Sequence, residues 1–147
     1  MRLLILSASL LFAACAAKPV ALPAEGKVLQ GYLDGTAALA NDDYTTAHKA
    51  FSVYEADTKA VAELSPTAAA LAKAADLKEA RRALNAATLA VAKYSTAKGL
   101  DKAAVKFYFC PMSKQGGNWA SLNDKVENPY FGNGMRDCGQ SVTPPTR

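Results

Sequence analysis

Two pairs of sulfur-bearing side chains lie near the end of this sequence. Met112 follows Cys110 after one residue, and Met135 precedes Cys138 by a short interval. Thiolate and thioether groups are soft ligands, which favour Cu(I) over harder divalent ions. The four residues therefore form a candidate site for a soft metal. Copper as Cu(I) is the first choice, silver is an alternative, and zinc is weaker because Met is a poor zinc ligand.

A disulfide between Cys110 and Cys138 is the alternative chemistry for the same residues. Exported proteins live in oxidising compartments, where disulfides form and persist. In this interpretation Met112 and Met135 are apolar side chains that fill space. Composition and spacing leave both interpretations open.

His48 is the single histidine of the chain and a candidate extra ligand. It lies beside the apolar stripe of a predicted helix, near Phe51 and Ser52, and neutral imidazole is an acceptable donor for copper. A lone helical histidine is nevertheless more often a packing or surface residue. His48 is therefore the weakest member of the predicted metal site.

The sequence lacks the patterns of enzymes and of nucleic-acid-binding proteins. It contains no phosphate-binding glycine loop, no nucleophile elbow and no Cys-x-x-Cys pair. The net charge is +4, the Lys residues are scattered as single charges along the helical part, and there is no basic cluster interleaved with aromatics. We therefore expect a binding protein that is not an enzyme and has no nucleic-acid partner.

The first residues are typical of an exported lipoprotein. Residues 1–14 resemble a signal peptide, with Arg2 before an apolar stretch that is too short to span a bilayer. The sequence LFAAC, which ends at Cys15, resembles a bacterial lipobox, although Phe12 stands where Leu is usual. We expect lipidation of Cys15 and a flexible tether over residues 15–25. The predicted location is the bacterial cell envelope, facing the periplasm and attached to the membrane through the lipid anchor only.

Residues 26–98 are predicted to form the helices that support the site. Ala, Leu, Lys and Glu are abundant there, and internal Gly and Pro are sparse. The second predicted helix has an apolar stripe that runs on to Val61 and Leu64, and the third is expected to end at Ala75. The following residues punctuate the helices: Asp42 or Asp43, Ser65 with Pro66, Asp76 with Glu79, and Lys98 with Gly99. The fold class is therefore mainly α, an up-and-down helical bundle of three to four helices.

A short β-hairpin is predicted to carry the sulfur-bearing residues. Alternation of apolar and polar residues from Val105 to Phe109 predicts a strand, and residues 139–143 can supply its partner. This pairing would bring Cys110 and Cys138 together. The loop between them is long, and long loops in compact domains are usually functional or cross-linked. The domain thus covers residues 26–147, with the site-bearing loop at 105–143.

The end of the chain resembles a bacterial periplasmic domain of uncharacterised function. That domain occurs alone in exported proteins and fused to the adaptor subunits of copper and silver efflux pumps. Ala120 and Arg136 stand where the family favours Leu, and the helical part resembles the family more loosely. The motifs that carry the resemblance are Cys110-Pro111-Met112, Gly117 with Trp119 and Ser121, Asn128-Pro129-Tyr130-Phe131-Gly132, and Met135 with Cys138-Gly139.

The resemblance implies a helical bundle with a sulfur-bearing loop in proteins that handle copper. It favours metal binding through the four sulfur ligands over the disulfide, with the Asn-Pro-Tyr-Phe-Gly motif and Trp119 as loop scaffold. The expected role is copper buffering or delivery, and the expected partner is a heavy-metal efflux adaptor or a periplasmic copper carrier. The alternative is a disulfide-stapled interaction module in which Trp119, Tyr130 and Phe131 present a partner-binding surface.

Overall fold

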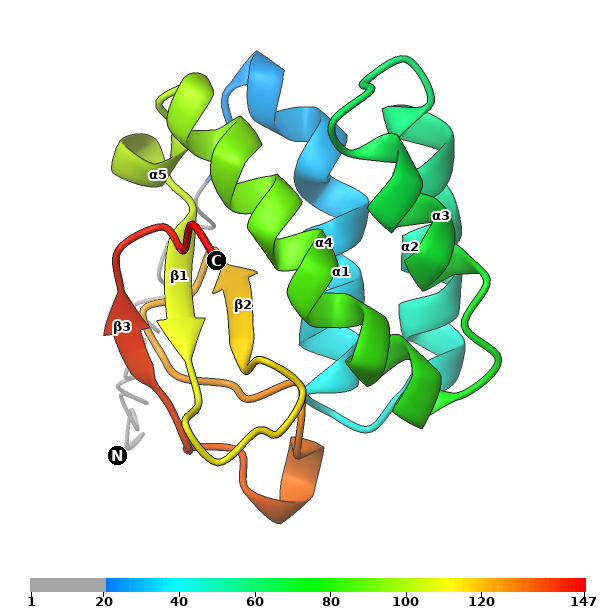
Figure 1. The fold of residues 1–147 in the computed structure, drawn as a ribbon, viewed down its shortest axis with the longest axis vertical. Coiled ribbons are helices and arrows are strands. Elements are labelled where there is room, and N and C mark those ends of the chain that lie inside the picture. The colour runs from blue at the N-terminus through cyan, green and yellow to red at the C-terminus, as the bar shows by residue number, and fades with distance from the viewer. Residues whose placement is uncertain (1–20) are drawn as a thin grey trace, which may run out of the picture.

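The computed structural model describes residues 21–147, which form a mainly α domain with one small sheet. The predicted signal peptide, Cys15 and the first part of the tether lie outside the described residues. The sheet lies beside the helices, against α1 and α4 (Figure 1). The mainly α class is thereby confirmed. Within residues 21–147, none of the helices has both the length and the apolar character needed to cross a membrane.

The helices follow one another with short connections. Helix α1 packs against α2, α2 against α3, and α3 against α4. The up-and-down order of a bundle stays a prediction. The helical elements are η1 (Ala24–Leu29), α1 (Gln30–Leu39), α2 (Tyr44–Thr58), α3 (Ser65–Ala72), α4 (Leu77–Ala97), α5 (Leu100–Ala103) and the short η2 (Gly132–Gly134).

The predicted caps lie at the starts of α2 and α4. The carboxylate of Asp43 accepts a 3.0 Å hydrogen bond from the backbone N–H of Thr46. The carboxylate of Asp76 accepts one of 2.8 Å from the N–H of Glu79, whose own side chain accepts from the N–H of Ala75 at 2.9 Å. These bonds satisfy N–H groups that the helix itself cannot pair, so local sequence sets both helix starts.

Two helix ends differ from the prediction. Helix α2 ends at Thr58 and does not include Val61 or Leu64, and α3 ends at Ala72 before Ala75. The backbone N–H of Val61 donates to the carbonyl of Thr58 at 2.8 Å, which starts a turn in place of a further helical turn. Leu64 is still fully buried because this turn directs it into the core.

Tyr32 connects the helices to the sheet. Its fully buried hydroxyl shares a 2.7 Å hydrogen bond with the Thr88 hydroxyl of α4 and accepts one of 3.2 Å from the backbone N–H of Ala120. Burial raises the pKa of Tyr32, so the phenol stays neutral. One side chain of α1 thereby fixes the position of a strand relative to α4.

The sheet has three antiparallel strands with β1 at its centre. They are β1 (Lys106–Phe109), β2 (Asn118–Ser121) and β3 (Gln140–Val142), in the order β2-β1-β3. Strand β1 does pair with the segment after Cys138, as expected, but β2 inside the long loop was not predicted. The expected two-stranded hairpin is therefore replaced by a three-stranded sheet. An isolated hairpin is marginally stable, and β2 pairs the second edge of β1.

Candidate functional site

The structure brings Cys110 and Cys138 together where β1 ends and β3 begins. Phe109 pairs with Gln140, so the cysteines meet just beyond the end of this strand pair. Their Sγ atoms are 2.8 Å apart, and both are free thiols. Cys110 is fully buried, whereas Cys138 is partly exposed. The predicted proximity of the two cysteines is thus confirmed.

The separation of the two sulfur atoms lies between the values that the two chemistries require. A disulfide bond is about 2.05 Å long. Two thiolates that each lie about 2.3 Å from a tetrahedrally coordinated metal are about 3.8 Å apart. The sulfurs must approach by about 0.8 Å to form a disulfide, or separate by about 1 Å to hold such a metal.

The Cys138 thiol has a perturbed acidity. Its contact with the Cys110 thiol raises the pKa of Cys138, and burial adds to the rise, whereas a hydrogen bond from the backbone N–H of Met112 lowers it. A raised pKa keeps the thiol protonated at neutral pH and slows its reaction as a nucleophile. A bound cation would have the opposite effect, because a coordinating thiol loses its proton.

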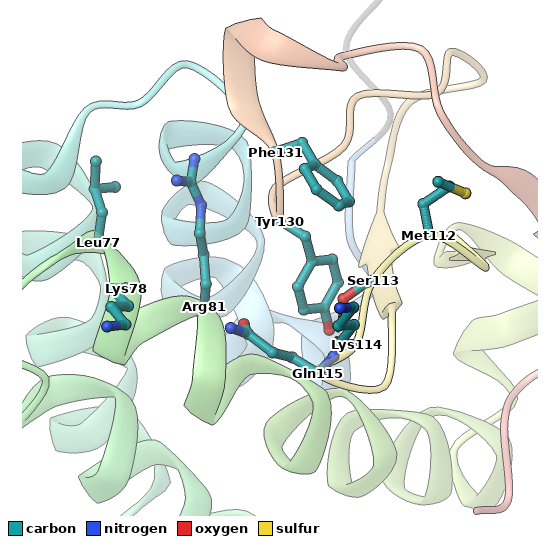
Figure 2. Close-up of a pocket in the computed structure, with 9 residues that line it drawn as sticks. All are labelled: Leu77, Lys78, Arg81, Met112, Ser113, Lys114, Gln115, Tyr130 and Phe131. Atoms are coloured by element: carbon teal, nitrogen blue, oxygen red, sulfur yellow. Dashed lines mark hydrogen bonds between the residues drawn. The ribbon is translucent and has the colours of Figure 1, made fainter.

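Met112 and Met135 place their thioether side chains in solvent. They are 60% and 39% exposed, which argues against a space-filling role for either. Their backbones adjoin the thiol pair: the backbone N–H of Met112 partly offsets the rise in the pKa of Cys138, and the carbonyl of Met135 accepts from the Cys138 N–H at 3.3 Å. Figure 2 shows the Met112 side chain pointing away from Tyr130 and Phe131.

His48 lies apart from the thiol pair. Its ring packs edge-on against Tyr44 within α2, with 5.6 Å between ring centroids. Helix α2 packs on α1 and α3, whereas the sheet packs on α1 and α4 (Figure 1). Within residues 21–147, no three side chains of His, Cys, Asp or Glu gather in one place. Within the described residues, the thioethers of Met112 and Met135 are the soft side chains that adjoin the thiol pair in sequence.

Asn128 holds the backbone of Cys138. This fully buried side chain donates from Nδ2 to the Cys138 carbonyl at 2.6 Å and accepts at Oδ1 from the N–H of Tyr130 at 2.8 Å. The N–H of Asn128 donates to the carbonyl of Arg136 at 2.8 Å. Asn128, the first residue of the Asn-Pro-Tyr-Phe-Gly motif, thus binds the backbone at Tyr130 and at Cys138, the two ends of the segment that contains Met135.

The aromatic residues of the loop pack in the core. Trp119 is 1% exposed, stacks on Tyr108 at 5.4 Å between ring centroids, and receives the edge of Tyr130 at 6.4 Å. The Tyr130 hydroxyl donates to the carbonyl of Asn118 at 2.5 Å. The expectation of a partner-binding surface is therefore wrong for Trp119 and Tyr130. Phe131 alone of the three is partly exposed.

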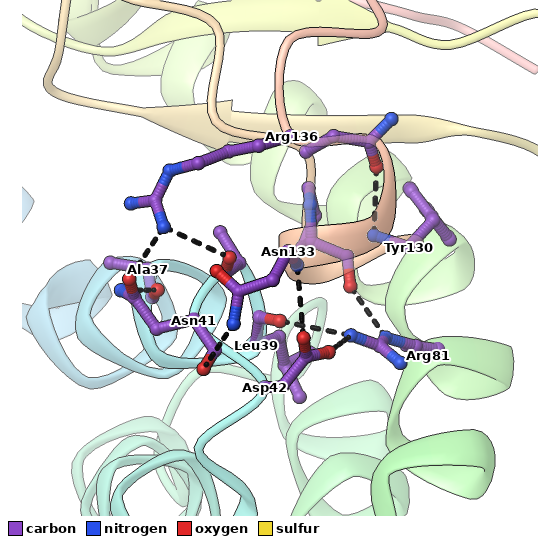
Figure 3. Close-up of polar contacts among 11 residues, drawn as sticks. Ala37, Leu39, Asn41, Asp42, Arg81, Tyr130, Asn133 and Arg136 are labelled. Atoms are coloured by element: carbon purple, nitrogen blue, oxygen red, sulfur yellow. Dashed lines mark hydrogen bonds and ion pairs between the residues drawn. The ribbon is translucent and has the colours of Figure 1, made fainter.

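Arg81 of α4 fastens the loop to the helices (Figure 3). Its Nε donates to the carbonyl of Pro129 at 2.7 Å, and one Nη donates to the Asp42 carboxylate at 2.5 Å and to the carbonyl of Leu39 at 3.1 Å. Asp42 also accepts from the N–H of Asn133 at 2.9 Å. The hydrogen bond from Arg81 is the main cause that lowers the pKa of Asp42, and the bond from Asn133 adds to it.

Arg136 makes a second attachment at the corner between α1 and α2. One terminal nitrogen donates to the Asn41 side chain at 2.7 Å (Figure 3). The other donates to the Glu127 carboxylate at 2.9 Å. Sequence reasoning missed the roles of Arg136 and Arg81, because neither residue belongs to a recognisable motif. The one sequence feature that singled out Arg136 was that the domain resembled by this chain favours Leu at that position.

Comparisons of the chain with family models, with curated proteins and with solved structures found no match. Its resemblance to the copper-associated periplasmic domain therefore stays a hypothesis. The arguments for function come from the residues and contacts described above.

Proposed function

We propose that this protein binds a soft metal ion, Cu(I) in the first place, through Cys110 and Cys138. Met112 and Met135 act as thioether ligands. The observation that carries this proposal is the meeting of two free thiols, 2.8 Å apart, in a turn region that exposes two thioethers. His48 is left out of the proposed ligand set because α1 separates its helix from the sheet.

The donor set fits a soft monovalent ion better than a hard divalent one. Thiolates supply most of the affinity and neutral thioethers supply selectivity for Cu(I) or Ag(I). A closed zinc site needs four strong donors, and the described residues offer the pair no third His, Cys, Asp or Glu. Partial exposure of Cys138 leaves one side of the pair open for an ion to enter.

The physiological role proposed here is copper buffering, or delivery of copper to an efflux system, in the cell envelope. The support is the lipobox-like sequence at Cys15, the resemblance of residues 107–142 to the efflux-associated domain, and the soft donor set. The partner would be a heavy-metal efflux adaptor or a periplasmic copper carrier. No catalytic role is proposed.

The alternative function is a disulfide-linked structural module, and the 2.8 Å distance between the Cys110 and Cys138 sulfur atoms also supports it. The thiols need to approach by only about 0.8 Å to form a disulfide, and an oxidising compartment favours that reaction. In this case the protein is a structural or interaction module of the envelope in which the Cys110–Cys138 bond joins the ends of β1 and β3, and no metal binds.

A free-thiol count separates the two functions. The soluble form that begins after Cys15 is purified anaerobically, treated with an alkylating reagent with and without one equivalent of Cu(I), and analysed by mass spectrometry. Metal binding predicts two alkylated cysteines without copper and protection of both with copper. A Cys110–Cys138 disulfide that copper does not affect would support the structural module instead. The variant with both cysteines changed to Ser is the control for adventitious copper.

A further inference from the structure

A cavity of about 450 Å³ lies between the start of α4 and the turn that follows Cys110 (Figure 2). Three cationic side chains line it, Lys78, Arg81 and Lys114, together with apolar groups of Leu77, Tyr130 and Phe131. We infer that this cavity binds a small organic anion, a carboxylate attached to an aromatic or compact apolar body. The inference does not depend on metal binding at the thiol pair.

The cavity carries positive charge that the protein itself leaves uncompensated. No Asp or Glu belongs to its lining. Within residues 21–147, Lys78 and Lys114 form no ion pair. Arg81 is partly neutralised by Asp42 through one terminal nitrogen, while its other terminal nitrogen, Nη1, has no hydrogen-bond partner among the described residues. A bound anion could therefore accept hydrogen bonds from the ammonium groups of Lys78 and Lys114 and from Nη1 of Arg81.

The first turn of α4 adds to this attraction. Leu77 and Lys78 are its first two residues and both line the cavity. The Asp76 cap satisfies the N–H of Glu79 and leaves the preceding N–H groups of the turn without a partner among the described residues. The positive end of a helix stabilises a nearby anion. The carboxylates of Asp76 and Glu79 already lie at this end of α4, so the three cationic side chains supply most of the attraction.

The opposite wall favours an apolar body over a bare inorganic ion. Figure 2 shows the rings of Tyr130 and Phe131 on the side facing Arg81 and Leu77. The part-exposed Phe131 offers apolar surface to a ligand, while Tyr130 is held in place by its hydrogen bond to Asn118. The volume lies within the range of small-molecule sites, toward its lower end, and suits a ligand of about one ring.

A titration followed by NMR tests the charge and the body of the ligand separately. Benzoate is added to the ¹⁵N-labelled, metal-free, reduced mature protein, and amide shifts are recorded. Benzyl alcohol, benzylamine and inorganic phosphate are titrated in parallel. We expect saturable shifts with benzoate at Lys114, Gln115 and Phe131, and binding at least about fivefold weaker for the other three compounds. Equal binding of benzylamine or benzyl alcohol would overturn the role of charge, and equal binding of phosphate would overturn the role of the apolar wall.

Matched variants test the place of binding. Lys78→Gln combined with Lys114→Gln should weaken benzoate binding about tenfold, because it removes two of the three cationic side chains that line the cavity. Lys102→Gln, in α5 beyond the far end of α4, should leave benzoate binding unchanged. Phe131→Ala should weaken benzoate and leave phosphate unaffected. The amide spectra of the variants show whether they fold, and a folded double lysine variant that binds benzoate as tightly as the wild type would refute the inference. Copper binding is tested separately by the thiol count of the wild-type protein with Cu(I), so failure of the anion site and failure of the copper site can be told apart.

Discussion

The side-chain amide of Asn128 donates a 2.6 Å hydrogen bond to the backbone carbonyl of Cys138, ten positions away in the chain. Cys138 precedes β3 and is not itself part of the strand pairing. Its backbone is therefore fixed by a buried side chain from the middle of the long loop as well as by the sheet. The distance between the two thiols depends on that loop being folded.

Asn128→Ala should lower the free energy of unfolding by about 2 to 4 kcal/mol, because the buried Cys138 carbonyl and the Tyr130 N–H each lose a partner. Urea unfolding at neutral pH measures the change. Asn123→Ala is the control, since it removes one exposed side-chain hydrogen bond, from Nδ2 to Glu127, and should cost less than about 1 kcal/mol. Similar losses in both variants would contradict the role given to Asn128.

Gly132→Ala should destabilise the protein by about 1 to 3 kcal/mol, since Gly132 has a φ of +54° and an added Cβ would lie 2.1 Å from the Asp42 carboxylate. The same collision would disturb the ion pair between Asp42 and Arg81. Gly134→Ala is the matched control, because a Cβ there meets nothing within 4 Å. The two thermal midpoints should therefore separate, and an unchanged midpoint for Gly132→Ala would refute the close contact.

Stability should fall as the pH drops below the ordinary carboxylate range. The pKa of Asp42 is lowered by its hydrogen bond from Arg81, and that of Glu127 by its hydrogen bond from Arg136. A lowered folded-state pKa gives stability that is present above the ordinary values of 3.8 and 4.5 and is lost as the pH falls through the folded-state values. Urea midpoints measured between about pH 6 and pH 2 test this direction.

Asp42→Asn should make that acid dependence shallower, because it removes one of the two carboxylates. Asp137→Asn is the comparison, as Asp137 is exposed and forms no ion pair within residues 21–147. If Asp42→Asn and the wild type lose stability in parallel, Asp42 does not contribute.

Cys110→Ala should lower the pKa of Cys138 toward its ordinary value of 9.0, because the contact with Cys110 is the main cause of the rise. The measurement is the midpoint of the pH profile for alkylation of the single remaining thiol. Cys110→Ser, which keeps a hydrogen-bonding group, is the comparison and should shift the midpoint less. An unchanged midpoint in Cys110→Ala would show that the two thiols do not interact.

Met112→Leu combined with Met135→Leu should weaken Cu(I) binding about tenfold or more if the thioethers are ligands, by analogy with the loss of a supporting metal contact. Competition with a Cu(I) chelator of known affinity measures it. His48→Ala is the control and should bind copper like the wild type, because His48 packs against Tyr44 on α2. Wild-type affinity in the double Met variant would remove the thioethers from the site.

Local sequence was enough to predict where α2 and α4 begin. Asp43 and Asp76 cap helices through bonds that reach only three residues along the chain, so the signal is contained in a short window. Apolar periodicity likewise located α1, α2, α4 and β1. It extended α2 too far, because the apolar positions of Val61 and Leu64 are filled from a turn and not from a helix.

The candidate site could be predicted only in part. Residue type and spacing identified Cys110, Met112, Met135 and Cys138, and the pairing of β1 with the segment after Cys138 followed from alternation. Strand β2 was missed because its place depends on its pairing with β1 and on a hydrogen bond from Ala120 to Tyr32, 88 positions away in the chain. Burial of Trp119 and Tyr130 likewise depends on packing between segments that the sequence pattern does not connect.

Sequence by itself determined which residues can do chemistry here, because softness, charge and helix propensity belong to single side chains and their near neighbours. Only the tertiary structure decided how closely the two thiols approach, that His48 is apart from them, and that Arg81 and Arg136 fasten the loop to the α1–α2 corner. The attachments made by Arg81 and Arg136 rest on hydrogen bonds between residues roughly 40 to 95 positions apart. Such contacts form only when the whole core has packed, so no local pattern in the chain records them.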